Sequence, residues 1–158
     1  MSKMNYFESG LDNLGNQGDA LSKLGEEKVE NARETAEAMD RIQMTDEETQ
    51  AIIDRARENM RRIKSEIAEN EVAAPMEEVT TGLQETGNEA GDAAAMEKTN
   101  ADTMAEVGGD YGDIAAGAAD ALNQRAEEFT GIKDKAAEMH DRFKEQTEAA
   151  TAALESLF

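Results

Sequence analysis

The residues of this chain that could take part in chemistry are one histidine, many carboxylates and one glycine-rich turn. His140 is the only histidine, and there is no cysteine. An imidazole can serve as a general base or a metal ligand near neutral pH, but a lone one at the edge of a helix is more often a solvated or packed residue. No serine forms a recognisable nucleophile–base pattern with it.

The carboxylates do not form a recognisable metal site. Di-iron sites in helical bundles combine glutamates from facing helices with two Glu-x-x-His pairs, which a single histidine cannot supply. Residues 110–120 carry aspartates but lack the spacing of a calcium-binding loop. The glutamate runs are therefore interpreted as solvated helix faces, and no metal is expected.

The glycine-rich turn is GGDYGD, from Gly108 to Asp113. A phosphate-binding loop normally follows a strand and carries a lysine or a Gly-x-Gly-x-x-Gly pattern. Here aspartates flank the glycines and would repel phosphate, so the turn is interpreted as a hinge. These residues together predict no enzyme and no cofactor.

The charge balance limits the classes of molecule that this chain could bind. Thirty-six acidic residues face 16 lysines and arginines, which gives a formal net charge of −20 for 158 residues. Binding to a nucleic-acid backbone needs clustered basic residues that displace counterions, so no direct nucleic-acid binding is expected. An anionic membrane surface is disfavoured for the same reason. A basic protein remains a possible partner.

Hydropathy and aromatic content bear on location and packing. No segment approaches the ~20 apolar residues of a membrane span, so no membrane span is expected. The first 15 residues contain no apolar run typical of a secretory signal, which predicts a protein that is cytoplasmic or exported without a classical signal peptide. Aromatic residues make up 4% and tryptophan is absent. We expect a thin, alanine-rich core that self-association or a partner completes.

The first half of the chain predicts a helical hairpin. Residues 1–18 form an N-terminal segment with a short amphipathic turn before the Gly15–Gly18 interruption, and residues 19–75 contain two helices. Thr45 and Glu48 have capping-box spacing at the start of the second helix, and a proline should end it at residue 75. The short connection predicts an antiparallel pair. The hairpin seam of the second helix comprises Ile53, Met60, Ile63 and Ile67.

The middle of the chain has a different composition. Residues 65–124 contain 14 acids, a single base and seven glycines. The glycines are typical of breaks, so residues 76–112 are predicted to be an acidic, glycine-rich linker with short helices. Methionine suits irregular apolar surfaces, and Met76, Met96 and Met104 are candidates for surface that becomes buried only on assembly.

Residues 113–158 predict one long C-terminal helix. Its apolar residues recur at alternating spacings of three and four, as in a coiled coil. Arg125 and Gln146 are polar positions in this pattern, where they would set register or mark an opening of the seam. The predicted interaction seam comprises Leu122, Phe129, Ile132, Met139, Phe143 and Leu157.

The predicted fold class is all-α: an antiparallel helical hairpin plus a long C-terminal coiled-coil-like helix, forming an elongated bundle with a flexible acidic middle. Residues 19–42 resemble residues 120–143, with nine of 24 positions identical at an offset of 101. The shared bias toward alanine and glutamate also produces such agreement, so duplication stays open. Lys28 and Asn31 stand opposite Phe129 and Ile132, so the two segments should not bury the same face.

Three function classes fit these features. The first is a non-enzymatic helical interaction or assembly protein that binds a helical partner or forms a homo-oligomer. Small, acidic, helical chains without cysteine are common among substrates and structural parts of specialised bacterial secretion systems, although the Trp-x-Gly turn of small type VII substrates is absent. The alternatives are an acidic inhibitor that mimics phosphate and binds a basic protein, and an amphipathic coat on an apolar granule surface.

Overall fold

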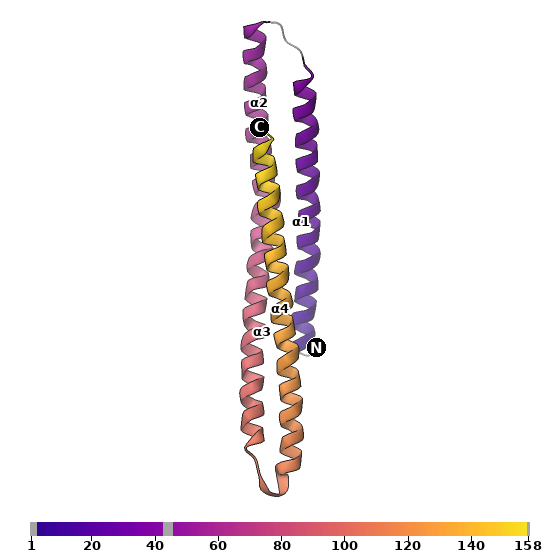
Figure 1. Cartoon of the computed structure of the whole chain (residues 1–158), viewed down its shortest axis with the longest axis vertical. Coiled ribbons are helices and arrows are strands. Elements are labelled where there is room, and N and C mark those ends of the chain that lie inside the picture. Colours follow the sequence, from indigo (N-terminus) through magenta and orange to yellow (C-terminus); the bar gives the residue numbers. More distant parts are fainter. Residues whose placement is uncertain (1–2, 43–45, 158) are drawn as a thin grey trace. The chain divides into compact units, whose positions relative to one another are not determined.

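The computed structural model describes residues 3–42 and 46–157, and these residues are helical throughout except for short turns. They contain four long helices: α1 (Lys3–Asp40), α2 (Glu47–Ala68), α3 (Ala74–Ala105) and α4 (Gly112–Ser156). The π-helical turn η1 (Glu69–Ala73) joins α2 to α3, and the 3₁₀ turn η2 (Gly109–Tyr111) precedes α4 (Figure 1). No strand occurs in the described residues, which confirms the predicted all-α helical bundle.

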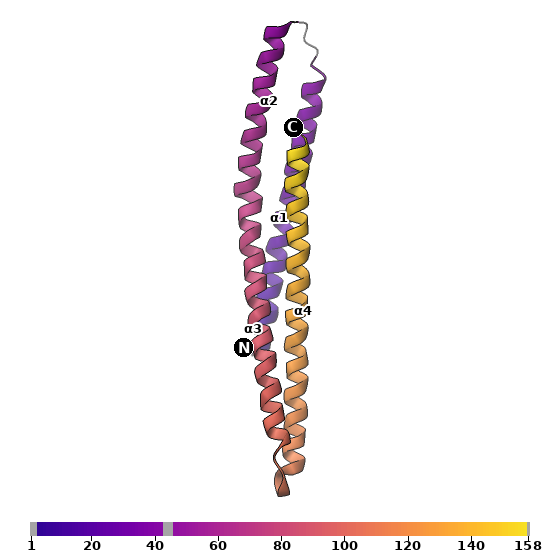
Figure 2. The same cartoon turned by 60° about the vertical axis from the view of Figure 1, so that its left-hand side comes forward.

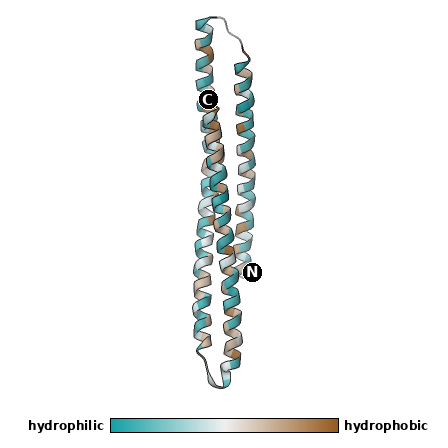
Figure 3. Cartoon of the chain, in the orientation of Figure 1, coloured by the Kyte–Doolittle hydropathy of each residue, from teal (hydrophilic) through white to brown (hydrophobic). Residues whose placement is uncertain are grey.

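The helices divide between two compact units. Unit 1 comprises Met1–Gly15 and Thr81–Asp141, and unit 2 comprises Asn16–Thr80 and Arg142–Phe158. Helices α1, α3 and α4 each contribute to both units, whereas α2 belongs to unit 2 alone. Apolar residues occur in short stretches scattered along every helix, as expected for a thin core (Figure 3).

The core of unit 1 combines a few large side chains with many alanines. Phe7 meets Phe129 edge to face, with 5.8 Å between ring centroids. Leu11 and Leu83 are fully buried in the same unit. Because alanine is small, the surrounding helices can approach closely, although each alanine contributes little burial energy. The buried alanines are Ala90, Ala93, Ala101, Ala115, Ala119, Ala126 and Ala136.

The core of unit 2 is centred on Phe143 of α4, which is fully buried. Its ring lies directly against Gly18 of α1, where a Cβ atom would overlap the ring. On the same pair of helices, Ser22 donates a hydrogen bond of 2.6 Å to Gln146. The other buried apolar residues of unit 2 are Ala32, Val72, Met76 and Val79.

The expected interruption at Gly15–Gly18 is wrong, because α1 is continuous from Lys3 to Asp40. A glycine inside a helix costs about 1 kcal/mol relative to alanine. Here the two glycines admit large side chains of α4, Met139 against Gly15 in unit 1 and Phe143 against Gly18 in unit 2. Burial of those side chains offsets the cost, so the glycines mark close helix contact rather than a break.

The expected end of the second helix at Pro75 is also wrong. Pro75 is the second residue of α3, directly after the π-helical turn η1. In that turn the Ala74 N–H donates to the carbonyl of Glu69, five residues back. Proline lacks an N–H and crowds the carbonyl four residues earlier. The wider turn shifts the hydrogen-bonding pattern just before the proline, so the helix continues past it.

The middle of the chain differs from the expected flexible linker, because its first thirty residues belong to the continuous helix α3. Gly82 packs against Leu14 and Gly87 against Ala136, so these glycines are contact positions in unit 1. The chain reverses only after Ala105, where Gly109 adopts a φ of 71° that favours glycine. Helix α4, which follows the turn, agrees with the predicted long C-terminal helix.

The predicted antiparallel hairpin is present in unit 2. Helices α1 and α2 run side by side in opposite directions in two views of the chain (Figures 1 and 2). Arg57 of α2 forms an ion pair of 2.8 Å with Asp40 of α1. Farther along, Lys28 of α1 forms one of 2.7 Å with Glu71 of η1.

Candidate interaction surfaces

The residues considered for metal binding do not gather into one group within the described parts of the chain. His140 lies half-buried on α4, with Nδ1 at 3.2 Å from a carboxylate oxygen of its neighbour Asp141. No group of three or more potential ligands converges among the described residues. No described helix is long and apolar enough to cross a membrane.

The predicted seam of α4 faces the interior of the two units. Phe129, Ile132 and Phe143 are buried, and Leu122, Met139 and Leu157 are half-buried. These six residues therefore pack within the chain itself. Little of this seam is left to meet a partner.

The polar positions of that seam are exposed, although Gln146 still accepts the hydrogen bond from Ser22 of α1. Arg125 is exposed and lies 4.0 Å from Glu97, while its neighbour Ala126 is buried. Gln146 is likewise exposed and its neighbour Thr147 is half-buried. Ile132 and Met139, which occupy the same heptad position, are buried and half-buried, so the exposure is confined to the polar residues of the seam.

The predicted hairpin seam of α2 is divided between two environments. Ile53 and Met60 are half-buried, whereas Ile63 is 53% exposed and Ile67 is 37% exposed. No residue of α2 is fully buried. Two of the four residues of this seam are thus partly covered by the rest of the chain, and the other two are exposed to solvent.

The reason is the rotation of α2 about its own axis. The partly covered residues recur every three or four positions: Thr49, Ile53, Arg57, Met60, Lys64 and Ala68. Arg57 is drawn to this side by Asp40, and burial of Lys64 lowers the pKa of its ammonium group. The sequence pattern shows which residues of a helix are apolar. It does not show how contacts between polar residues set the rotation of the helix about its axis.

This rotation exposes a line of apolar residues, here named the α2 stripe: Ile52, Ala56, Ile63 and Ile67. Their spacings of four, seven and four residues place them along one face of a helix. Ile52 is 60% exposed, more than Ile63. The seam predicted from the sequence does not include Ile52, although Ile52 lies on the same face of α2 as Ile63 and Ile67.

Asp46 caps the start of α2, and the predicted capping box includes Thr45, which lies outside the described residues. The Asp46 carboxylate accepts hydrogen bonds from the N–H of Thr49 at 2.8 Å and from its hydroxyl at 2.5 Å. These bonds, with the hydroxyl contributing most, lower the pKa of Asp46 below its ordinary value. The cap fixes where the helix that carries the stripe begins.

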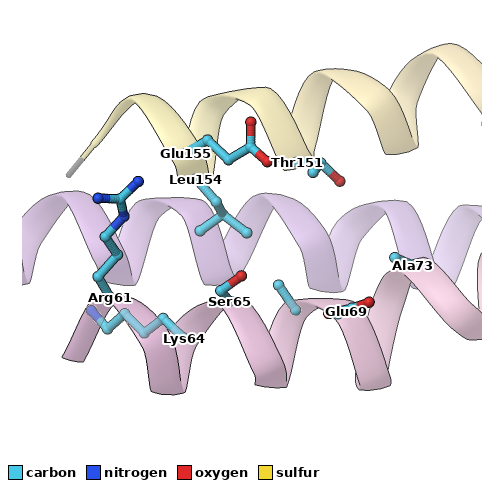
Figure 4. A pocket seen from close by; sticks show the side chains of 9 residues that line it. Arg61, Lys64, Ser65, Glu69, Ala73, Thr151, Leu154 and Glu155 are labelled. Carbon is cyan, nitrogen blue, oxygen red and sulfur yellow. The ribbon is translucent and has the colours of Figure 1, made fainter. Parts of the chain in front are cut away.

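A cavity of about 500 Å³ lies in unit 2 between α2 and the end of α4. Leu154 points from α4 toward α2, and Arg61 and Lys64 line the cavity from α2 (Figure 4). Glu69 and Glu155 also line it, so cations and carboxylates are mixed. This composition does not select a ligand of one charge.

A second group of exposed apolar residues lies in unit 1, on the later part of α3, in the turn after it and at the start of α4. Met96, Val107, Tyr111 and Ile114 are exposed, Tyr111 and Ile114 by 70% and 72%. The acidic residues Asp102, Glu106, Asp110 and Asp113 are exposed among them. We name these eight residues the acidic tip.

The sequence identified only Met96 of the acidic tip as a candidate surface residue. Met104 is half-buried, and Met76 is buried in the core of unit 2. The hinge assigned to GGDYGD did indicate a turn, and apolar residues beside a turn are a signal that could have located the rest.

Comparison with known proteins gives no further assignment: no family model, no curated protein and no solved structure matches this chain.

Proposed function

We propose that this chain is a non-enzymatic helical interaction protein and that the α2 stripe is where a helical partner docks. One observation carries the proposal: three of the four isoleucines of α2 are exposed, on a helix without a fully buried residue. Covering an isoleucine completely is worth roughly 1.5–3 kcal/mol. A partner that covers the stripe would therefore gain substantial binding free energy.

The shape of the stripe favours a helix as the partner. Its residues span positions 52–67, about 22 Å at 1.5 Å per residue. A narrow apolar line of this kind matches the packing of side chains between two helices. Helix-in-groove recognition uses anchors with the same spacings.

The proposal is tested with an apolar fluorescent dye and with the variant Ile63→Asp. The wild-type chain should bind the dye or associate, and the variant should lose either property while keeping its helical circular dichroism. The matched control is Ile63→Val, which keeps an apolar residue at the same site. Wild-type protein that neither binds dye nor associates would contradict the proposed docking surface.

A second candidate, the acidic mimic of phosphate, is favoured by the continuity of α3. A mimic needs carboxylates in a fixed row, and the regular helix holds Glu85, Glu89 and Asp92 exposed along one face. The corresponding test is competition with DNA for a basic protein. Competition that weakens with salt and is lost in Glu85→Gln/Glu89→Gln/Asp92→Asn would support the mimic.

The coat-protein and secretion-system interpretations stay predictions. A coat protein should gain helicity when apolar particles are added, since its helices would separate and lie on the surface. The described residues are already helical, so such a gain would require helix that is lost in free solution. Unchanged circular dichroism on adding particles would argue against a coat.

A further inference from the structure

The large exposed apolar residues of the described chain fall, apart from Tyr6, into two groups. Ile42, Ile52, Ile63 and Ile67 belong to unit 2, and Met96, Val107, Tyr111 and Ile114 belong to unit 1. Unit 2 thus contains the α2 stripe and unit 1 contains the acidic tip. The two surfaces differ in the charge that surrounds them.

The surroundings of the α2 stripe are basic in an otherwise acidic chain. Residues 52–67, the span of the stripe, contain five lysines and arginines and three acids. Arg55 and Arg62 each directly precede a stripe residue, so they lie along one flank of it, and Glu66, which precedes Ile67, lies on the same flank. Within the described residues, neither forms an ion pair; Arg62 donates only a hydrogen bond of 3.3 Å to Asn59. Both guanidinium groups are available to a partner.

The surroundings of the acidic tip have the opposite sign. Residues 97–113 contain five acids and a single base. Asp102, Glu106, Asp110 and Asp113 are exposed. No ion pair involves these four carboxylates in the described part of the chain. The acidic tip therefore combines exposed apolar side chains with exposed carboxylates that neighbour them in the sequence.

We infer that the partner of the α2 stripe is the acidic tip of a second copy of this chain. This inference rests on the proposed function and names its partner. Apolar side chains would meet at the centre, with Arg55 and Arg62 of one copy near Asp110 and Asp113 of the next. Opposite charges around an apolar centre set the choice and orientation of partners.

Pairing of identical surfaces is disfavoured by the same charges. Two acidic tips in contact would bring together eight carboxylates. Two α2 stripes would bring together four arginines, Arg55 and Arg62 of each copy, against only two glutamates, Glu66 of each copy. Like charges placed opposite one another are repulsive. The contact is therefore heterologous, and each assembly keeps one free stripe and one free tip unless it closes.

The experiment is a complementation of two variants, each with one surface disabled. Ile63→Asp disables the stripe and Ile114→Asp disables the tip, and both residues are exposed, so the fold should persist. Light scattering should show larger species for the wild-type chain and a single-chain mass for each variant alone. An equimolar mixture should give a two-chain species, because one intact stripe and one intact tip remain. Circular dichroism verifies folding, and Ile52→Asp and Tyr111→Asp replace any variant that fails it.

Three results would overturn the inference. If Ile114→Asp alone associates as the wild type does, the stripe pairs with something other than the tip. If the mixture stays at the mass of one chain, stripe and tip do not bind each other. If the wild-type chain has the mass of one chain at every concentration, no self-association exists. In each case, dye binding by the wild-type chain that is lost in Ile63→Asp would still support the α2 stripe as a docking surface. A wild-type chain that binds no dye would contradict both the docking surface and the inferred partner.

Discussion

Helices α2 and α4 have equally regular apolar patterns but different surroundings. Phe129, Ile132 and Phe143 of α4 are buried within the chain. In contrast, α2 has no fully buried residue and leaves Ile52 and Ile63 exposed. The regularity of a pattern therefore indicates which face of a helix is apolar, but not whether the same chain covers that face.

The neighbouring residues account for this difference. Helix α1 offers α4 the glycines Gly15 and Gly18, which leave room for Met139 and Phe143. Against α2, α1 presents the carboxylate of Asp40, which forms an ion pair with Arg57. This ion pair favours an orientation in which a polar side of α2 faces α1. The same helix thus buries one seam and turns the other partly outward.

The largest expected effect comes from truncating a buried residue of α4. Phe143→Ala should lower the free energy of unfolding by about 3–5 kcal/mol, because it removes a fully buried ring. Ile63→Ala on the exposed stripe should change it by less than about 0.5 kcal/mol. Denaturant titration of both variants, at a concentration where the chain is monomeric, measures the difference. Equal decreases in the free energy of unfolding for the two variants would contradict the difference in burial between α4 and α2.

The next effect tests the close contact between α1 and α4. Gly18→Ala should destabilise the chain by roughly 1–3 kcal/mol, because the new Cβ overlaps the ring of Phe143. The control is Gly117→Ala in α4, where nothing lies within 4 Å of the added carbon. That variant should gain up to about 1 kcal/mol from helix propensity. A stabilised Gly18→Ala variant in thermal unfolding would show that the contact is looser than described.

A smaller effect is expected from charges beside the stripe. The double variant Arg55→Glu/Arg62→Glu should weaken self-association about tenfold, since two attractive contacts become repulsive. Sedimentation measurements should show that this deficit shrinks as salt rises, because screening reduces interactions between exposed charges. Adding Asp110→Lys/Asp113→Lys to the partner chain should restore binding. Equal affinities of the double variant and the wild type would mean that charge does not select the partner.

The smallest effect concerns the cap of α2. The folded-state pKa of Asp46 is lowered by hydrogen bonds from Thr49, so its contribution to stability is present above the ordinary aspartate pKa and is lost as pH falls through the lowered value. Amides in the first turn of α2 should therefore lose protection against hydrogen exchange on acidification, when each rate is compared with the intrinsic rate at the same pH. Asp46→Asn keeps a capping side chain but does not titrate, and its exchange should lack this dependence. Identical pH profiles for the two proteins would contradict the cap.

The sequence was sufficient for the helical class, the hairpin and the long last helix, since these follow from periodicity and a short connection. It was insufficient for helix boundaries at Gly15, Gly18 and Pro75. Local propensity predicts breaks at such residues, but packing against Met139 and Phe143 and a π-helical turn before the proline override it. These contacts join segments far apart in the sequence and leave no local signal.

The candidate surface was only partly predictable. Ile63 and Ile67 were identified as apolar seam residues, but their exposure depends on the rotation of α2 set by Arg57 and Asp40. The exposed Ile114 adjoins a recognisable turn, yet turn signals do not show which apolar residues remain uncovered. The solvent-facing residues of a thin bundle are decided by tertiary contacts.

The most direct measurement is the light-scattering mass of the wild-type chain and of Ile63→Asp after size exclusion, over a range of concentrations, with circular dichroism on the same fractions. The α2 stripe as an intermolecular surface predicts a wild-type mass above one chain that rises with concentration. It also predicts a single-chain mass for Ile63→Asp with unchanged helicity. Identical single-chain masses for both proteins, with equal helicity, would contradict self-association through the stripe.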